Sequence, residues 1–225
     1  MPPRIHDKNA LPEKPPRPAG RSDGHATRAQ ILETAGQLFA DLGFDATTSK
    51  NICESCGCNT AAVNYHFGSR AELYTTVLIE SHRRLISLDT ILDITHSNLD
   101  AREKLSRILD NLLEGIDASQ WHSRLFFREI VTPSPFMDTL ITQEAMPKFV
   151  LIRGLLSDIT GLPADDPRIT RCLLSTIAPN LMLLIANRDT VSKVFGNLWA
   201  DKAALKQHLK TFLFAGLDAI SLADA

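Results

Sequence analysis

Hydrophobic residues recur at helical spacing along the chain from about residue 27 onward. Ile31, Ala35, Leu38 and Leu42 lie three or four residues apart, so they share one face of a helix that Gly43 ends. Further helices are expected at about 70–88, 105–116, 124–131, 136–160, 168–187 and 205–220. Because no segment alternates apolar and polar residues over the length of a strand, the pattern predicts an all-α protein.

Three short helical segments follow one another near the N-terminus, at about 27–42, 48–55 and 60–65. Thr48 and Asn59 are favourable N-cap residues, and Gly57 permits a sharp turn between the second and third segments. Two short helices joined in this way are typical of the helix-turn-helix, whose second helix enters the major groove of DNA. Ala61 suits contact with a thymine methyl group and Asn64 suits adenine, so the third segment is the candidate recognition helix.

Five short motifs follow one another in a single stretch between residues 43 and 73: Gly43-Phe44-Asp45-Ala46-Thr47-Thr48, Ile52-Cys53, Gly57, Val63-Asn64-Tyr65-His66-Phe67 and Ser69-Arg70-Ala71-Glu72-Leu73. This series resembles the DNA-binding domain of TetR-family transcriptional regulators over about residues 27–85. The Ala-Val-Asn-Tyr-His-Phe version, together with Leu125-Phe126-Phe127-Arg128-Glu129, resembles a CecR-like subgroup of that family. Together they identify the chain as a candidate member.

The resemblance implies which residues of the first domain meet DNA. Thr48 would cap the second helix at the DNA backbone, and Thr60 would open the recognition helix. The family usually has Tyr at position 64, so whether Asn64 or Tyr65 faces the bases stays open. The predicted DNA-contacting set is Thr48, Asn59, Thr60, Ala61, Asn64, Tyr65, His66 and Arg70, with the last three at phosphate or helix-packing positions.

The chain divides into three predicted parts: 1–24, 25–85 and 86–225. The first holds six prolines and several Lys and Arg residues, and is interpreted as a disordered, Pro-rich basic arm. Such an arm is either a solvated tail or a contact to phosphates or the minor groove. The second part is the helix-turn-helix domain, and the third is a helical domain that binds an effector and dimerises.

The resemblance implies a small-molecule effector and a homodimer built from the last two helices. The segment 168–187 is apolar on nearly all sides, and the 205–220 stripe is too apolar for one small domain to cover easily, so both favour a four-helix bundle between two copies. Aromatic and Met side chains suit an adaptable apolar pocket, although ordinary core packing is the alternative for each of them. The predicted ligand-binding set is Trp121, Phe126, Phe127, Arg128, Phe149 and Met182.

Three cysteines cluster at Cys53, Cys56 and Cys58. A structural zinc site normally needs four ligands, and buried free cysteines commonly pack like small apolar residues. We therefore predict no metal and no cofactor, and keep a thiol- or metal-responsive regulator as the alternative function.

Composition narrows the classes of function. The net charge of −2 excludes bulk attraction to nucleic acid, so any DNA contact must come from a local patch. Four cysteines are too few for a secreted disulfide framework, and neither a signal peptide nor a membrane span is apparent, so we expect a cytoplasmic protein. Because motifs of hydrolases, metalloproteases and nucleotide-binding enzymes are lacking, we predict no enzyme. The expected function is a repressor that a small molecule releases from double-stranded operator DNA.

Overall fold

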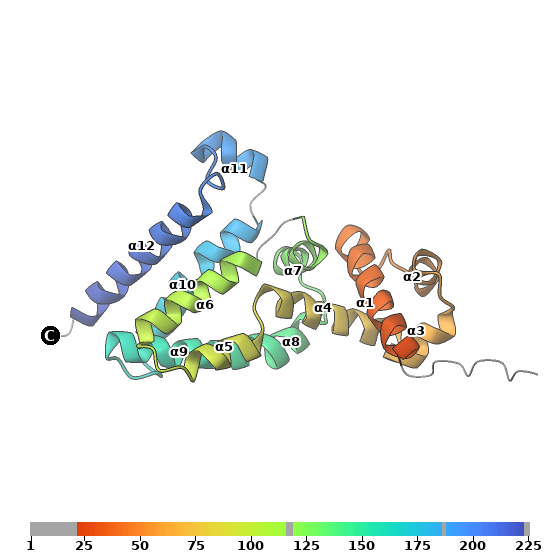
Figure 1. The fold of residues 1–225 in the computed structure, drawn as a ribbon, viewed down its shortest axis with the longest axis horizontal. Coiled ribbons are helices and arrows are strands. Elements are labelled where there is room, and N and C mark those ends of the chain that lie inside the picture. Colours follow the sequence, from red (N-terminus) through yellow and green to blue (C-terminus); the bar gives the residue numbers. More distant parts are fainter. Residues whose placement is uncertain (1–21, 116–118, 186–187, 223–225) are drawn as a thin grey trace, which may run out of the picture.

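The computed structural model describes residues 22–115, 119–185 and 188–222, which are helical with no strand (Figure 1). The predicted all-α fold is confirmed. The elements in chain order are α1 (Ser22–Leu42), α2 (Ser49–Cys56), α3 (Thr60–Phe67), α4 (Arg70–Leu85), α5 (Leu88–Thr95), α6 (Ala101–Gly115), α7 (Trp121–Val131), α8 (Met137–Leu140), the π-helical turn η1 (Ile141–Ala145), α9 (Met146–Thr160), α10 (Pro167–Ile185), α11 (Arg188–Phe195) and α12 (Lys202–Leu222).

The helix boundaries differ from the sequence prediction at several points. Helix α1 begins at Ser22, so residues 22–24 belong to it and not to the predicted arm, whose other residues, 1–21, lie outside the described part of the chain. The α5 and α11 helices were not predicted as separate elements. Both are only eight residues long, which gives a hydrophobic period little room to repeat.

The predicted helix-turn-helix is present at one end of the molecule (Figure 1). The Thr48 side chain accepts a hydrogen bond from the Asn51 amide and begins α2, and the Asn59 side chain accepts one from the Ala62 amide and begins α3. Between them Gly57 adopts a φ of 68°, a left-handed conformation that glycine takes without strain. The Gly57 amide donates to the Cys53 carbonyl oxygen, so the glycine ends α2 and lets the chain turn into α3.

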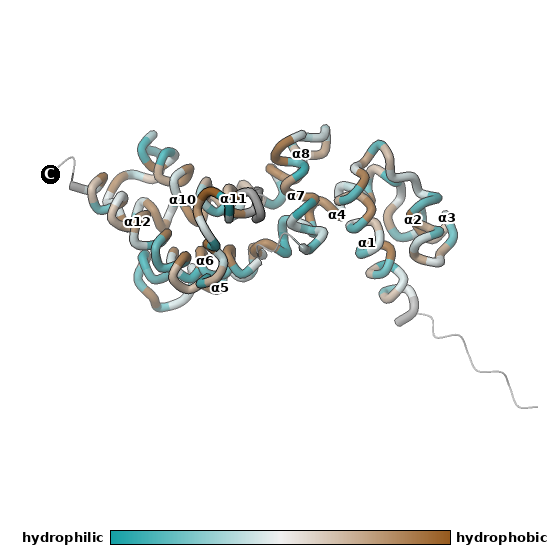
Figure 2. Tube along the Cα trace, turned by 90° about the horizontal axis from the view of Figure 1, so that it is seen from above, coloured by the Kyte–Doolittle hydropathy of each residue, from teal (hydrophilic) through white to brown (hydrophobic). Residues whose placement is uncertain are grey.

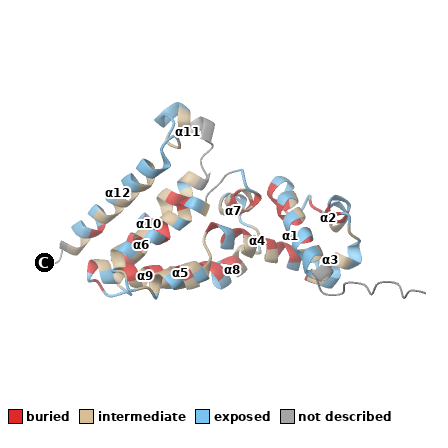
Figure 3. Ribbon diagram, in the orientation of Figure 1, coloured by how far each residue is buried: buried red, intermediate tan, exposed pale blue. Residues whose placement is uncertain are grey.

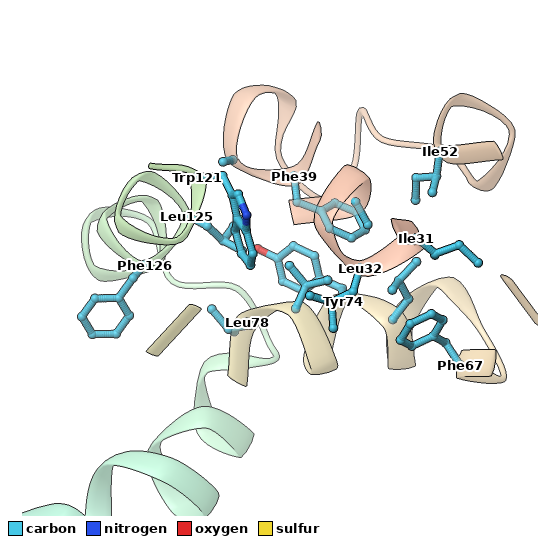
Figure 4. Packing of buried hydrophobic residues seen from close by; sticks show 14 of the residues in the cluster. Ile31, Leu32, Phe39, Ile52, Phe67, Tyr74, Leu78, Trp121, Leu125 and Phe126 are labelled. Carbon is cyan, nitrogen blue, oxygen red and sulfur yellow. The ribbon is translucent and has the colours of Figure 1, made fainter. Parts of the chain in front are cut away.

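The hydrophobic core of the helix-turn-helix continues past residue 85 into the rest of the chain. Trp121, Leu125 and Phe126 of α7 are buried in the same cluster as Phe39 of α1 and Tyr74 of α4. Figure 4 shows Trp121 facing the side of Phe39 and Tyr74, whereas Phe126 projects from the other side of α7. Helix α7 thus packs against both α1 and α4, and it joins the two predicted domains as one body.

A second cluster lies at the opposite end, between α5, α6, α9, α10 and α12. Polar and hydrophobic residues are mixed along α10 and α12 (Figure 2), and most of α11 and α12 is exposed or half-buried (Figure 3). Leu174 and Met182 of α10 and Phe212 of α12 are exposed by more than half of their surface. The described chain therefore leaves apolar surface open along these two helices.

The packing of α7 on α1 yields a stability prediction. A Cβ atom at residue 36 would lie 2.6 Å from the Trp121 indole, so Gly36→Ala forces α1 and α7 apart. We expect Gly36→Ala to lower the free energy of unfolding by roughly 1–3 kcal/mol, as overpacking does. The measurement is chemical denaturation followed by circular dichroism.

Gly154→Ala is the matched control. Gly154 also lies inside a helix, α9, but nothing stands within 4 Å of the Cβ position, so alanine should raise stability by roughly 0.5–1 kcal/mol. Equal behaviour of the two variants would contradict the described seating of Trp121.

Candidate DNA interface and ligand cavity

Helix α3 presents one polar, solvent-facing side. Thr60, Ala61, Asn64 and Tyr65 are exposed, and Tyr65 is 84% exposed although it is a large aromatic residue. The opposite side of the helix carries Val63 and Phe67, which are buried in the core. The exposed side chains are small or can hydrogen-bond, so this face can approach base edges closely.

Asn64 and Tyr65 are both exposed, so the question left open by the sequence is not decided in favour of one of them. His66 is half-buried, and its ring lies 5.0 Å from the ring of Tyr65 and 6.4 Å from that of Phe67. Its ring therefore packs at the base of the exposed face.

Arg70 has contacts that the sequence did not indicate. Its Nη1 atom donates hydrogen bonds to the carbonyl oxygens of Phe44 (2.5 Å) and Thr47 (2.7 Å), and its guanidinium lies 3.9 Å from the Phe44 ring centroid. These interactions hold the loop between α1 and α2, including the residue before the Thr48 cap. Arg70 thus has a structural reason for its type that is separate from DNA.

An apolar cavity of about 220 Å³ lies where α4 through α10 meet. Its wall is mainly aliphatic and aromatic, with Phe126, Met137, Phe149 and Ile152 among its members. Four polar residues also reach it: His82 of α4, Lys148 of α9, and Thr176 and Asn180 of α10. This composition, apolar with a few polar groups, is typical of small-molecule sites.

Lys148 is the centre of a buried polar network at the cavity, with only 2% of its surface exposed. Its Nζ atom lies 3.1 Å from Glu144 Oε2 and 2.8 Å from His82 Nδ1, and Glu144 Oε1 accepts a hydrogen bond from Arg83 Nε at 2.6 Å. Burial lowers the pKa of Lys148, while the hydrogen bond to Glu144 opposes that shift. Burial and the Lys148 charge lower the pKa of His82 to about 3, and the neutral ring accepts at Nδ1 because the Lys148 ammonium can only donate.

Asn180 has one satisfied and one unsatisfied end. Its Nδ2 donates to the Thr176 carbonyl oxygen at 2.9 Å, which fixes the amide orientation because a carbonyl can only accept. Its Oδ1 has no hydrogen-bond partner among the described residues, and water cannot easily reach it because the residue is only 4% exposed. An unpaired buried acceptor is costly, so this atom needs an explanation.

Two of the six predicted ligand residues, Phe126 and Phe149, line this cavity, and four do not. Trp121 is fully buried between α1 and α7, where its Nε1 donates to Glu33 (2.6 Å). Phe127 is half-buried outside the lining, and Arg128 is exposed beside the Leu42 carbonyl. Met182 lies in an open groove between α10 and α12. These four lie outside the cavity, because residue type does not reveal which side of a helix faces a cavity.

Four polar residues of the cavity were not predicted from the sequence: His82, Lys148, Thr176 and Asn180. Glu144 and Lys148 are four residues apart, a spacing that is common on solvated helix faces, so their burial gave no signal. Asn180 follows Pro179 in a stretch that is otherwise apolar from Ile177 to Ala186, and a polar residue there was an available hint.

The cysteine cluster does not support a thiol- or metal-responsive site. Cys53 and Cys56 are buried, and Cys56 Sγ lies 2.7 Å from Cys58 Sγ. Burial, with contributions from the neighbouring thiols, raises the pKa of Cys58 to about 12, which disfavours a reactive thiolate. Across residues 22–115, 119–185 and 188–222, no three His, Cys, Asp or Glu side chains are placed to share a metal ion. In the same segments, no helix has the length and apolar character needed to cross a membrane.

A helix-turn-helix followed by a helical domain is an arrangement that DNA-binding transcription regulators use. Residues 31–77 match the family of bacterial regulatory proteins named tetR, and residues 101–220 match the C-terminal domain of the HTH-type transcriptional dual regulator CecR. The chain belongs to the TetR family of regulators.

Relatives among known proteins are themselves regulators. The repressor KstR2 of Rhodococcus jostii is 30% identical over 46% of this chain and 50% of its own length, so the match spans about half of that relative. The activator FasR of Mycolicibacterium smegmatis is 25% identical over 72% of this chain and 73% of its own. The structure of FadR from Bacillus subtilis in complex with stearoyl-CoA aligns with a TM-score of 0.64 at 14% identity, over 84% of this chain and 98% of that one.

Burial of His82 predicts a pH dependence of stability. Its pKa is about 3 in the folded protein and about 6.5 when unfolded, so below pH 6.5 the unfolded chain takes up a proton that the folded chain does not. Folding therefore loses free energy as the pH falls from 6.5 toward 3, and the loss is about 2 kcal/mol at pH 5.

The measurement is urea denaturation at pH 7.5 and pH 5 for the wild type and His82→Gln. Glutamine does not titrate, and its amide oxygen can still accept a hydrogen bond from Lys148. The variant should lose less stability between the two pH values. An identical loss in both proteins would show that His82 is not buried in its neutral form.

Proposed function

We propose that this chain is a homodimeric, ligand-responsive transcription regulator that binds operator DNA through α3 and releases it when a small molecule fills the cavity. The observation that carries the proposal is that helix α4 extends from the helix-turn-helix to the cavity. Helix α4 begins at Arg70, beside the helix-turn-helix, and ends at the cavity with His82 and Leu85. A ligand that shifts one end of this helix moves the other.

The DNA contacts follow from the exposed face of α3. Thr60, Ala61, Asn64 and Tyr65 enter the major groove, while Thr48 and Asn59 meet phosphates from the exposed starts of α2 and α3. His66 supports Tyr65 from below. Arg70 acts as a positioning residue, since its Nη1 bonds hold the 43–48 loop.

Dimerisation through α10 and α12 is supported by the apolar groove between them. Leu174, Met182 and Phe212 are exposed there beside Gly216, and a second copy of the same two helices completes a four-helix bundle. The two-fold axis places two α3 helices on successive turns of the duplex, about 34 Å apart.

Helix α7 gives the cavity a second connection to the DNA-binding end. Phe126 lines the cavity, whereas Trp121 contacts α1 and donates to Glu33, which pairs with Arg84 of α4 at 3.0 Å. The Tyr74 hydroxyl donates to Glu129 of α7, so α4 and α7 move together. Coupling between two sites in one protein is typically worth about 1–3 kcal/mol, or roughly 5–150-fold in affinity.

Repression is the proposed direction of control, because a dimer seated on a promoter excludes the polymerase. KstR2 carries the name of a repressor and FasR that of an activator, so transcription from the target promoter in a purified system decides the sign.

Replacing Ala61 tests the placement of α3. Ala61→Leu adds bulk to the exposed face of α3 and should hold it off the base edges, lowering affinity for specific DNA by about tenfold or more, since one base-edge interaction is worth roughly 1–3 kcal/mol. Fluorescence anisotropy with duplex DNA from upstream of the chain's own gene measures it.

Ala164→Leu serves as the control, because Ala164 is exposed in the loop after α9, far along the chain from α3. If both variants bind DNA as the wild type does, α3 is not the recognition helix.

The charge distribution gives the N-terminal arm a proposed role. Residues 22–85 hold five Lys and Arg against seven Asp and Glu, whereas residues 1–21 hold five against two. Deleting residues 1–21 should weaken binding to all DNA sequences alike and flatten the plot of log affinity against log salt by about 0.9 for each phosphate that the arm neutralises. If the salt slope is unchanged, the arm does not contact DNA phosphates.

A further inference from the structure

The cavity carries two polar features that a purely apolar ligand would leave unused. Lys148 has three N–H donors, and its two partners among the described residues are Glu144 and His82. Asn180 Oδ1 is buried without a partner in the described part of the chain. Both residues line the same apolar space, and Asn180 also borders a smaller pocket beside α12. A ligand in the apolar space that satisfies both would offer an acceptor to Lys148 and a donor to Asn180.

The charge at the Lys148 end favours an anionic acceptor. Glu144 is shared by two cations, since it accepts a hydrogen bond from Arg83 and pairs with Lys148. The Glu144 carboxylate therefore faces two basic side chains, and His82 adds no second anion beside them. A carboxylate is the acceptor that best balances a buried ammonium, because charge-assisted hydrogen bonds are about twice as strong as neutral ones.

Asn180 Oδ1 can only accept a hydrogen bond, so a ligand that binds it must offer a hydrogen-bond donor. Its Nδ2 is committed to the Thr176 carbonyl oxygen, so the amide cannot turn to present a donor instead. A hydroxyl group on the ligand satisfies the Oδ1 atom.

The size of the cavity limits the rest of the molecule. A protein cavity of about 150 Å³ accommodates benzene, so about 220 Å³ accommodates roughly ten non-hydrogen atoms. A long acyl chain on its carrier, such as the stearoyl-CoA bound by FadR, far exceeds this volume.

We propose that the effector is a small, largely apolar hydroxy acid, with its carboxylate on Lys148 and its hydroxyl on Asn180. This inference rests on the proposed function, because it names the ligand class for the same cavity. Because Lys148 Nζ also contacts His82, a carboxylate on Lys148 places the ligand's charge near the end of α4.

Isothermal titration calorimetry on the full chain tests the ligand class with two matched series. The first is 4-hydroxyphenylacetate, phenylacetate and tyramine, and the second is 8-hydroxyoctanoate and octanoate. At least one hydroxy acid should bind about tenfold or more tightly than its partner without the hydroxyl, and tyramine, which replaces the carboxylate with an ammonium, should not bind. Equal affinity with and without the hydroxyl, preference for tyramine, or no binding of either hydroxy acid at 10 mM overturns the proposal.

Two variants separate a ligand contact from a structural effect. Asn180→Leu removes the unpaired acceptor, so it should raise the melting temperature of the free protein, lower the affinity for the hydroxy acid to that of the plain acid, and leave the plain acid unchanged. Lys148→Met should weaken both acids equally. If Asn180→Leu weakens the hydroxy acid and the plain acid by the same factor, the Oδ1 atom does not contact the hydroxyl.

Fluorescence anisotropy with operator DNA shows whether the proposed ligand class or the proposed function has failed. If the chain binds DNA and a compound of another class releases it, only the ligand class is wrong. If the chain binds no DNA specifically, the proposed function is wrong, whatever the calorimetry shows.

Discussion

The contact between the Trp121 indole and the backbone of α1 at Gly36 is the constraint on which the rest of the structure depends. Because residue 36 has no side chain, α7 packs directly on α1, and Trp121 is fully buried there. Its Nε1 reaches Glu33, which in turn pairs with Arg84 of α4. Three helices are thereby fixed together at one point, and the ion pair between Arg124 of α7 and Asp41 of α1 adds a second contact between these helices.

The second constraint is a buried lysine. Taking Lys148 out of water is unfavourable unless its charge is compensated, and Glu144 and His82 provide partial compensation. A protein whose cavity served only as packing would gain stability from an apolar residue there. The buried Lys148 and the unpaired Asn180 Oδ1 both lower the stability of the free protein, which supports the proposal of a polar ligand.

The sequence predicted those parts of the fold that depend on local rules. The Thr48 and Asn59 caps, the Gly57 turn and the exposed face of α3 are all formed, because caps, turns and helical period are properties of a few neighbouring residues. The family membership followed from the same short region and was confirmed by the match over residues 31–77. The DNA contacts themselves stay a prediction.

The cavity was beyond such rules, since it forms where residues from seven helices converge. Trp121 and Met182 are of residue types that often line pockets, yet Trp121 lies in the core and Met182 faces the groove between α10 and α12. His82 and Lys148 are of residue types that usually lie at the surface, yet both are buried. Only the three-dimensional arrangement, which brings α4 beside α9, distinguishes these cases.

If cavity and helix-turn-helix are coupled as proposed, the state of the cavity sets the affinity for DNA. The decisive measurement is the dissociation constant of Ala145→Phe for duplex DNA from upstream of the chain's own gene, compared with the wild type by fluorescence anisotropy. Ala145 is buried and lines the cavity, so a phenyl ring there occupies the ligand's space in the absence of ligand. We expect a folded variant whose DNA affinity is at least about fivefold lower. A folded variant that binds the DNA as tightly as the wild type would contradict the coupling of cavity and DNA.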